Sequence, residues 1–505
     1  MRAVTTNIVE TVNGLIEGVV APALRVFKGI PFAAPPVGEL RWRAPQPVAS
    51  WTGVRRADRF GSAPIQPLIP NDAIMRQFSF ATPPECGISE DCLYLNVWTP
   101  TIAGPHPVVV WLYGGGHRLG SGSHPSSDGA ALARQGVVVV SLNYRVGALG
   151  YLAHPALTEE AGVSGNYAGL DIIAALQWVQ RNIAAFGGDP ACVTLFGQSA
   201  GAAHLHVLMA SPLARGLFHR AIAHSGGRAR GGLLGGKMPS LAEAEEKGAQ
   251  LLQELGARSL RELRNLPADV MTGPPRFWNI IQDGTLLPDT VDAIFAAGAQ
   301  ADIPLITGFN TEDGTPYPVH EIETAAKFAS YARQQFGDSA AEFTRLYDGD
   351  NDLAAHAASF SYRRDAAFGY QAWRWAKTQQ ATAKSAVRMF LFDRAPPVPP
   401  GRCFREALPP GGYGAYHGAE IWYAFDNLAA QNWPWQPEDH ALAANFTAYY
   451  AAFAASGDPN RDGLPAWPLY DPDNNQVLRL GDTIRAAPLP NLAAMQFIEA
   501  RLAAG

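Results

Sequence analysis

The sequence predicts an α/β fold in which a large, mostly parallel central sheet is flanked by helices. Two observations support this prediction. Strand-like and helix-like runs alternate between residues 108 and 208, and a glycine-rich segment directly follows two of the strand-like runs. Such alternation is typical of a parallel sheet covered on both faces. Because ligands of these sheets bind at the carboxyl ends of the strands, we expect the glycine-rich segments to lie at the functional site.

Each element of the alternating region has its own pattern. PVVVWLY (107–113) and GVVVVSLNYR (136–145) are short, apolar and rich in β-branched residues, as strands buried on both faces are. Apolar residues recur at helical spacing over 167–186, a segment long enough for a crossover helix. VTLFG (193–197) predicts a third strand, which runs directly into a helix at GQSAGAAHLHVLM (197–209).

Outside this region the patterns are weaker. Short alternating runs at 15–20 and 24–27 predict an antiparallel start to the sheet. The segments roughly 229–299 and 325–381 are helical and Ala-rich, and we interpret them as helical insertions. We therefore expect residues 1–505 to form a single domain that carries these two insertions.

Composition argues against several other classes of protein. Hydrophobic residues make up 47% of the chain and charged residues 17%, the net charge is −6, and we find no dense Lys/Arg run. A nucleic-acid partner is therefore not expected. The chain lacks an apolar run of membrane-spanning length and a secretory-type start. We expect a soluble, cytoplasmic monomer or small homo-oligomer without stable membrane insertion, while a secreted form stays open.

The four cysteines do not have the spacing of a zinc site, so we predict no metal. Cys192 lies in the apolar run CVTLF and is expected to be a buried small hydrophobe. Cys86 and Cys92 are close enough in sequence to pair in an oxidising compartment, and both the paired and the reduced form stay open.

Gly197-Gln198-Ser199-Ala200-Gly201 is a G-x-S-x-G run between a predicted strand and a predicted helix. A sharp turn there exposes the serine oxygen above the sheet and leaves the first helical N–H free to bind an oxyanion; this is the nucleophile elbow of the α/β-hydrolase fold. A serine alcohol needs a base to accept its proton. We predict Ser199 as the nucleophile.

Three consecutive glycines, 114–116, follow the strand that ends at WLY. Consecutive glycines turn sharply and present backbone N–H groups without side chains in the way. The α/β-hydrolase fold takes further oxyanion donors from a loop after an earlier strand. No Lys-Ser or Lys-Thr follows the glycines, so a phosphate loop is not indicated.

Taken together, these motifs resemble the type-B carboxylesterase and cholinesterase-like family, particularly its bacterial para-nitrobenzyl-esterase-type members. The resemblance extends over nearly the whole chain. The matching segments are FKGIPFAAPPVGELRWRAPQP (27–47), SEDCLYLNVWTP (89–100), WLYGGGHRLGSG (111–122), SLNYRVGALGYL (141–152), GNYAGLDIIAALQWVQRNIAAFGGDP (165–190), VTLFGQSAG (193–201) and YHGAEIWYAF (416–425).

The resemblance implies a set of site residues. The N–H groups of Gly115, Gly116 and Ala200 would form the oxyanion hole. The family's N-x-x-[acid]-G pattern falls on 310–314 and makes Asp313 the triad acid, although Glu312 stays a competing candidate. Of the 12 histidines, His417 matches the family's His loop and completes the order Ser, Asp, His.

Other positions are implied to support the site or the fold. Ser225 would support the triad by hydrogen bonding, and Arg41 and Glu90 would form a structural ion pair without a chemical role. Gln198 stands where the family usually has Glu, which removes a buried acid beside the site. His117 stands where an aromatic residue is common and makes the pocket mouth more polar.

The implied activity is ester hydrolysis through an acyl-enzyme, without a cofactor. His417 takes the Ser199 proton, the oxyanion rests on three N–H groups, and water completes the cycle. The resemblance implies that the loop between Ile65 and Asp91 would supply, in a cholinesterase, a Trp for the quaternary ammonium. This loop has no Trp here, so choline esters are not expected, whereas Phe78 and Phe80 could line an apolar pocket. We expect small-to-medium, uncharged aliphatic or aromatic esters as substrates.

Two alternatives remain open. The same machinery would serve a specialised ester, a carbamate or an amide. Some relatives with this fold are non-catalytic binding proteins, but those generally lack the triad residues that are present here.

Overall fold

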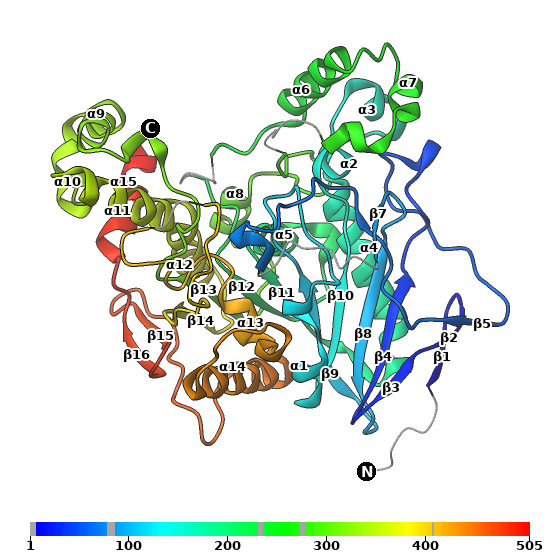
Figure 1. The fold of residues 1–505 in the computed structure, drawn as a ribbon. Coiled ribbons are helices and arrows are strands. Elements are labelled where there is room, and N and C mark those ends of the chain that lie inside the picture. Colours follow the sequence, from blue (N-terminus) through cyan, green and yellow to red (C-terminus); the bar gives the residue numbers. More distant parts are fainter. Residues whose placement is uncertain (1–6, 78–85, 231–235, 273–277, 407–408, 505) are drawn as a thin grey trace.

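A large central sheet dominates the computed structural model, which describes residues 7–77, 86–230, 236–272, 278–406 and 409–504 (Figure 1). The strands are β1 (Ile8–Thr11), β2 (Gly14–Glu17), β3 (Val19–Ala21), β4 (Leu24–Pro31), β5 (Val54–Arg56), β6 (Ala63–Pro64), β7 (Ile88–Ser89), β8 (Tyr94–Pro100), β9 (His106–Leu112), β10 (Val138–Leu142), β11 (Gly188–Gln198), β12 (Arg220–His224), β13 (Leu305–Asn310), β14 (Val387–Phe392), β15 (Gln476–Leu480) and β16 (Arg485–Pro488). The helices are α1 (Ala130–Arg134), α2 (Gly147–Tyr151), α3 (Pro155–Ala161), α4 (Tyr167–Asn182), α5 (Ala200–Ala210), α6 (Leu241–Glu254), α7 (Leu260–Asn265), α8 (Val291–Ala296), α9 (Ala325–Phe336), α10 (Ala340–Leu346), α11 (Asp352–Arg363), α12 (Tyr370–Thr382), α13 (Glu420–Ala424), α14 (Pro437–Ser456) and α15 (Leu492–Ala504).

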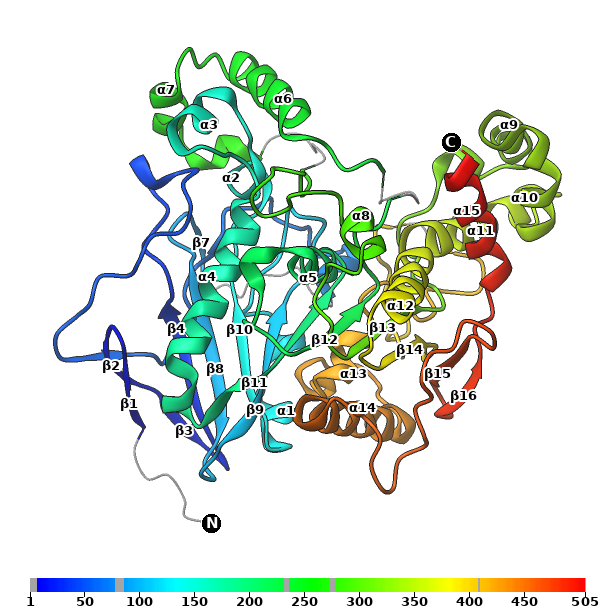
Figure 2. The ribbon, with the colours of Figure 1, turned by 180° about the vertical axis from the view of Figure 1, so that it is seen from behind.

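Eleven strands form the central sheet among the described residues, in the order β16-β15-β14-β13-β12-β11-β9-β10-β8-β4-β3. The strands from β10 through β9 and β11 to β15 pair in parallel, and the outer strands on both sides pair antiparallel. Every residue of β10, β13 and β14 is buried, because helices cover both faces of the sheet. Figure 2 shows α4 in front of the strands, whereas α13 and α14 lie in front of them in Figure 1. The predicted α/β fold is confirmed.

The individual strands of the alternating region are confirmed as well. In the central sheet, Val108 of β9 lies opposite Val138 of β10 on one side and opposite Val193 of β11 on the other. The three predicted strands are therefore neighbours. The antiparallel start is confirmed for β3, which pairs with β4. The run at 15–20 is split, since β2 joins β1 and β5 in a separate three-stranded sheet.

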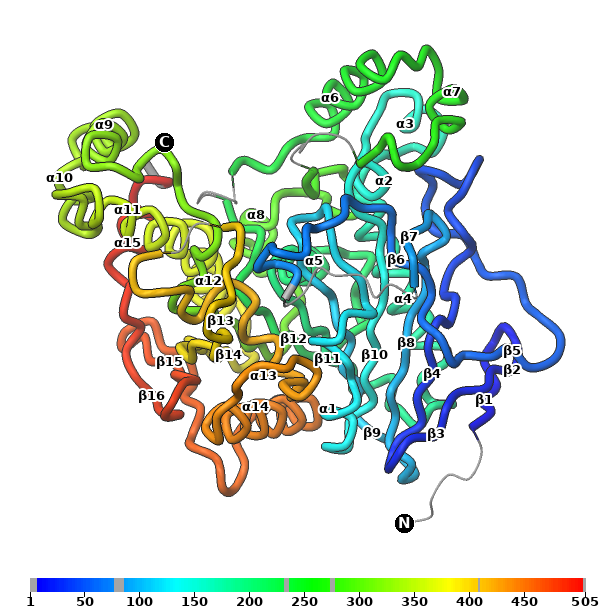
Figure 3. Tube along the Cα trace, viewed as in Figure 1, coloured from blue at the N-terminus to red at the C-terminus, as the bar shows by residue number. Residues whose placement is uncertain are grey.

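Helices occupy both segments that we interpret as insertions. Residues 229–299 contain α6, α7 and α8, and residues 325–381 contain α9 to α11, a π-helix at Arg364–Gly369 and most of α12. The pairs α6–α7 and α9–α10 stand apart from each other at the rim, as the trace in Figure 3 shows. α12 packs on β13 and β14 and is therefore part of the helical layer over the sheet.

The cysteines differ from expectation at one position. Cys192 is only half-buried, because β11 becomes fully buried from Val193 onward; its thiol lies 3.2 Å from the Ala454 carbonyl oxygen. Cys86 and Cys92 are buried and are not joined by a disulfide, so the structure contains the reduced form of this pair. Within the described part of the chain, none of the helices has both the length and the apolar character needed to span a bilayer.

Candidate active site

Ser199 lies at the junction of β11 and α5, as the G-x-S-x-G run predicts. Its backbone has φ 54° and ψ −119°, a strained conformation for a residue with a side chain. The turn is held by a 2.8 Å hydrogen bond from the Ser199 N–H to the His224 carbonyl oxygen. A Cβ on Gly201 would lie 2.1 Å from the Leu112 carbonyl oxygen, so only glycine lets α5 approach β9 this closely. The small residues of the motif are a packing requirement of the elbow.

The glycine loop after β9 lies against the elbow. Gly115 and Gly116 have φ of 126° and 59°, which glycine adopts without strain. A Cβ on Gly114 would come within 2.9 Å of the Ser199 Cβ, so the loop passes directly beside Ser199. Within the described part of the chain, the Gly115 and Gly116 N–H groups donate no hydrogen bond. Ala200 is the first residue of α5, where a helix leaves its N–H without a partner.

Asp313 and His417 form a buried pair behind this loop. The His417 Nδ1 lies 2.7 Å from the Asp313 Oδ1, and the second carboxylate oxygen accepts a 2.8 Å hydrogen bond from the Asn310 N–H. Burial raises the pKa of Asp313, although the hydrogen bond with His417 opposes that shift. A carboxylate on one side of the ring keeps the proton on Nδ1 and leaves Nε2 as the acceptor.

Glu312 takes a different role from its neighbour. Its side chain is exposed and accepts hydrogen bonds from the Ala415 N–H at 2.8 Å and from the Thr311 hydroxyl at 2.5 Å. The carboxylate therefore fixes the backbone of the loop before His417 and makes no contact with the imidazole among the described residues. The geometry favours Asp313 over Glu312 as the partner of the ring.

Gln198 contacts the His417 ring nitrogen that is not bound to Asp313. Its Nε2 lies 3.3 Å from the His417 Nε2, and the geometry is that of an amide N–H donating to a neutral imidazole. Among the residues that the structure describes, the Ser199 hydroxyl has no hydrogen bond to His417. Phe368 stacks on the His417 ring at 4.3 Å and lines the same pocket as Ser199. Imidazole and hydroxyl thus belong to one site, with the amide of Gln198 bound at the proton-accepting nitrogen.

The structure does not show the hydrogen-bonding role expected of Ser225. Its hydroxyl is buried and has no hydrogen-bond partner in the part of the chain that the structure describes. Instead its backbone N–H binds the Gly308 carbonyl oxygen at 2.8 Å, and φ is 48°, so the residue shapes the pocket wall after β12. The other two pocket residues of interest, Phe78 and Phe80, lie outside the described residues.

His117 lines the pocket beside the glycine loop. Its Nδ1 lies 3.0 Å from the Tyr151 hydroxyl, which also contacts the His204 Nε2 at 2.5 Å. Burial, assisted by the charge of Arg228, lowers the pKa of His117 to about 3, and burial lowers the pKa of His204 well below its usual value. Both imidazoles are therefore neutral at ordinary pH, and the polar wall that His117 contributes carries no charge.

Sequence reasoning missed a buried acid close to Asp313 and His417. Glu420 is fully buried and accepts a 2.5 Å hydrogen bond from the Asn310 side chain, and its other oxygen lies 3.3 Å from the His224 Nδ1. Although burial opposes ionisation, hydrogen bonding with His224 and Asn310 lowers the pKa of Glu420. Asn310 also binds the Tyr416 carbonyl oxygen at 2.9 Å, so this network ties β13 to the loop of the imidazole. The acid three residues after the histidine in YHGAE was the available signal.

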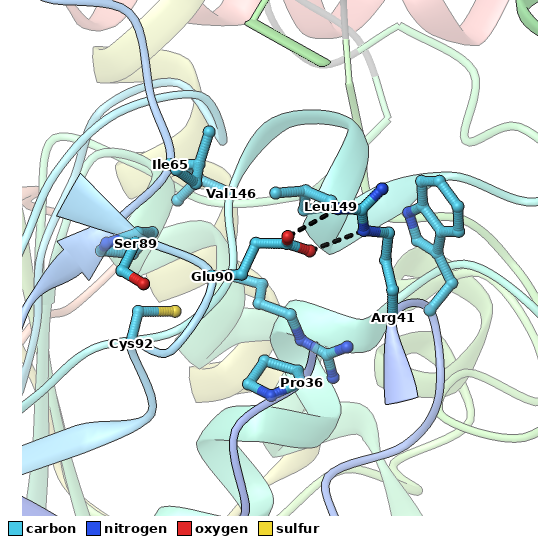
Figure 4. A pocket seen from close by; sticks show the side chains of 11 residues that line it. Pro36, Arg41, Ile65, Ser89, Glu90, Cys92, Val146 and Leu149 are labelled. Carbon is cyan, nitrogen blue, oxygen red and sulfur yellow. Dashed lines mark hydrogen bonds and ion pairs between the residues drawn. The ribbon is translucent and has the colours of Figure 1, made fainter. Parts of the chain in front are cut away.

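Arg41 and Glu90 form the expected ion pair away from this site. The Nε and Nη2 atoms of Arg41 each lie 2.6 Å from a different oxygen of Glu90 (Figure 4). The pair faces a small pocket that includes Cys92 and Leu149 and contains neither Ser199, Asp313 nor His417. Over the described ranges, we also find no cluster of His, Cys, Asp and Glu side chains arranged to hold a metal ion.

Known proteins match this chain over almost its whole length. The model of the "Carboxylesterase family" matches residues 5–498. Fumonisin B1 esterase from Sphingopyxis macrogoltabida is 38% identical over 94% of this chain and 86% of its own length. Para-nitrobenzyl esterase from Bacillus subtilis (strain 168) is 34% identical over 95% of this chain and 96% of its own. A solved structure of PNB esterase superposes with a TM-score of 0.83 at 30% identity, covering 98% of this chain and 99% of that one.

Proposed function

The chain belongs to the carboxylesterase family and is a serine-type carboxylic-ester hydrolase; from that premise we propose that Ser199, His417 and Asp313 carry out its reaction. The observation that supports this most directly is the buried Asp313–His417 hydrogen bond of 2.7 Å beside the strained turn that carries Ser199. Gly115, Gly116 and Ala200 are proposed as oxyanion donors.

The proposed reaction has two halves. The Ser199 oxygen attacks the ester carbonyl while the His417 Nε2 takes its proton, and Asp313 stabilises the resulting imidazolium. The tetrahedral oxyanion accepts hydrogen bonds from the three N–H groups, each worth about 3–4 kcal/mol in the transition state. His417 then protonates the leaving alcohol, and water repeats the sequence on the acyl-enzyme. The amide of Gln198 must leave Nε2 before the serine proton can arrive, since that nitrogen has one lone pair.

The finer statements about substrate and setting are proposals as well. We propose a single domain over residues 1–505 with helical insertions at roughly 229–299 and 325–381, acting as a monomer or small homo-oligomer in the cytoplasm without a nucleic-acid partner. The substrate is a small-molecule ester of short to medium length. The relatives' names refer to substrates as different as fumonisin B1 and a para-nitrobenzyl ester, so a specialised ester is the alternative.

Replacing Ser199 with Ala tests the assignment. We expect turnover of p-nitrophenyl esters of graded chain length to fall by at least about 10³-fold in a folded protein, as removal of a triad member does. An organophosphate should label Ser199 of the wild type, as mapped by mass spectrometry. Ser225→Ala is the matched control, because Ser225 lines the same pocket and its variant should still be labelled at Ser199. Retained turnover in S199A, or a label on Ser225, would reject the proposal.

A further inference from the structure

Arg228 is a buried cation in the wall of the pocket that contains Ser199. Only 4% of the residue is exposed, yet its Nε and Nη2 atoms have no hydrogen-bond partner among the described residues. The remaining nitrogen, Nη1, makes one long contact of 3.4 Å with the Gly236 carbonyl oxygen. The backbone N–H of Arg228 binds the His206 Nδ1 at 3.0 Å, which fixes the start of the side chain.

The two unpartnered atoms are the edge that this chain uses elsewhere to bind carboxylates. Arg41 places Nε and Nη2 on Glu90, as Figure 4 shows, and Arg145 places the same two atoms on Asp171 at 2.8 and 2.7 Å. This side-on fork matches the planar geometry of a carboxylate. A guanidinium that is withdrawn from water and left unpaired costs several kcal/mol, so an Nε–Nη2 edge that has no partner among the described residues favours an anion from outside the chain.

None of the described residues around Arg228 provides that anion. The described pocket lining contains no carboxylate, and Asp292, whose charge acts on Arg228 from a neighbouring cavity, forms no ion pair with it. Burial lowers the pKa of Arg228 to about 10, so the group stays protonated at neutral pH. Gln198 is an amide, so the residue next to the nucleophile adds no negative charge that would repel an anion.

We propose that Arg228 binds a carboxylate carried by the substrate, so that this enzyme prefers half-esters of di- or polycarboxylic acids over neutral esters. The inference rests on the proposed function in that it takes the pocket of Ser199 as the catalytic one. It also replaces the expectation of an uncharged substrate. One carboxyl group of such a molecule would be the ester that Ser199 attacks, and a second, free carboxylate would lie on the Nε–Nη2 edge.

The test compares two esters that differ in one terminal group, monoethyl adipate and ethyl hexanoate. We expect the ratio of their kcat/KM values to fall by roughly 30–100-fold in Arg228→Gln, because two charge-assisted hydrogen bonds are lost. Arg228→Lys keeps the charge without the fork and should show a smaller loss, of about tenfold. The matched control is Arg230→Gln, because Arg230 lines the neighbouring cavity with Arg228 but not the pocket of Ser199.

A binding measurement separates this inference from the assignment of the nucleophile. Calorimetry with Ser199→Ala should show tighter binding of monoethyl adipate than of ethyl hexanoate, and the difference should disappear in the double variant with Arg228→Gln. The inference is overturned if S199A binds both esters equally, if R228Q or R228K leaves the wild-type ratio unchanged, or if R230Q lowers the ratio as much as R228Q. Activity retained in S199A would instead refute the proposed nucleophile and leave this comparison intact.

Discussion

Asp313→Asn provides a sharp test of the proposed triad, because the structure fixes how the new amide must sit. The Asn310 N–H donates to the Asp313 Oδ2 at 2.8 Å, so the amide oxygen of the variant is held on that side. The amide nitrogen then faces the His417 Nδ1, 2.7 Å away in the wild type. Because an amide nitrogen only donates, the ring must accept at Nδ1 and carry its proton on Nε2.

The expected loss follows from that change of tautomer. An imidazole with a proton on Nε2 cannot take the proton of Ser199, and no carboxylate is left to stabilise an imidazolium. We expect kcat to fall by about 10⁴-fold, which corresponds to roughly 5.4 kcal/mol, while KM stays close to that of the wild type. Steady-state hydrolysis of p-nitrophenyl butyrate at pH 7 to 8 measures both constants.

Glu312→Gln is the control in the adjacent position. Its amide oxygen can still accept from the Ala415 N–H, which the carboxylate does at 2.8 Å, so the loop should stay in place. We expect kcat to stay within about tenfold of the wild type, since this side chain never touches the ring. A large loss in E312Q together with a small one in D313N would refute the assignment of the acid.

Three further predictions concern the groups around the site. Glu90→Gln leaves Arg41 buried without its counter-ion and should lower the free energy of unfolding by about 3–5 kcal/mol in urea titrations; a change below 1 kcal/mol would contradict the structural role of the pair. Gln198→Glu brings a carboxylate next to the His417 Nε2 and stabilises the imidazolium, so the acidic limb of the kcat/KM profile should move to higher pH; an unmoved limb would contradict the 3.3 Å contact. Burial holds the pKa of His117 at about 3, so below pH 6.5 the unfolded chain binds a proton that the folded chain does not. Stability should therefore fall as the pH is lowered, by up to about 1.4 kcal/mol per pH unit for this residue, and His117→Gln should flatten that slope in urea titrations at several pH values.

Much of the fold could be predicted because the informative patterns are local. The strands at 107–113, 136–145 and 193–197 are continuous apolar runs, and the sheet pairs them in parallel. The turn at Ser199 is possible only with small neighbouring residues, because larger side chains would clash with the sheet. The G-x-S-x-G motif was therefore sufficient to predict the turn. β13 and β14 were not predicted, since six-residue apolar runs between helical segments have no periodicity of their own.

The residues that sequence reasoning missed, or for which the structure differs from expectation, depend on burial in the folded chain. Arg228 stands in GGRARGG, a stretch typical of a solvated loop, and only the packed structure shows that its guanidinium is cut off from water. Ser225 was expected to donate a hydrogen bond, but the strand pairing that buries it leaves its hydroxyl without a partner among the described residues. Cys192 was expected to be buried because its run is apolar, yet burial along β11 begins one residue later.

The residues of the candidate site lie in two blocks of contacts, which Gln198 joins. Gly201 leaves no room for a Cβ beside the Leu112 carbonyl oxygen, so Ser199 and the glycine loop belong to one block of neighbouring strands. The imidazole and its acid belong to another block, joined through Asn310, Glu420 and the segment before α13. Under the proposed mechanism, a disturbance of the second block would slow proton transfer while the glycine loop keeps its shape. Such an enzyme would still bind analogues of the tetrahedral intermediate, yet it would form product slowly.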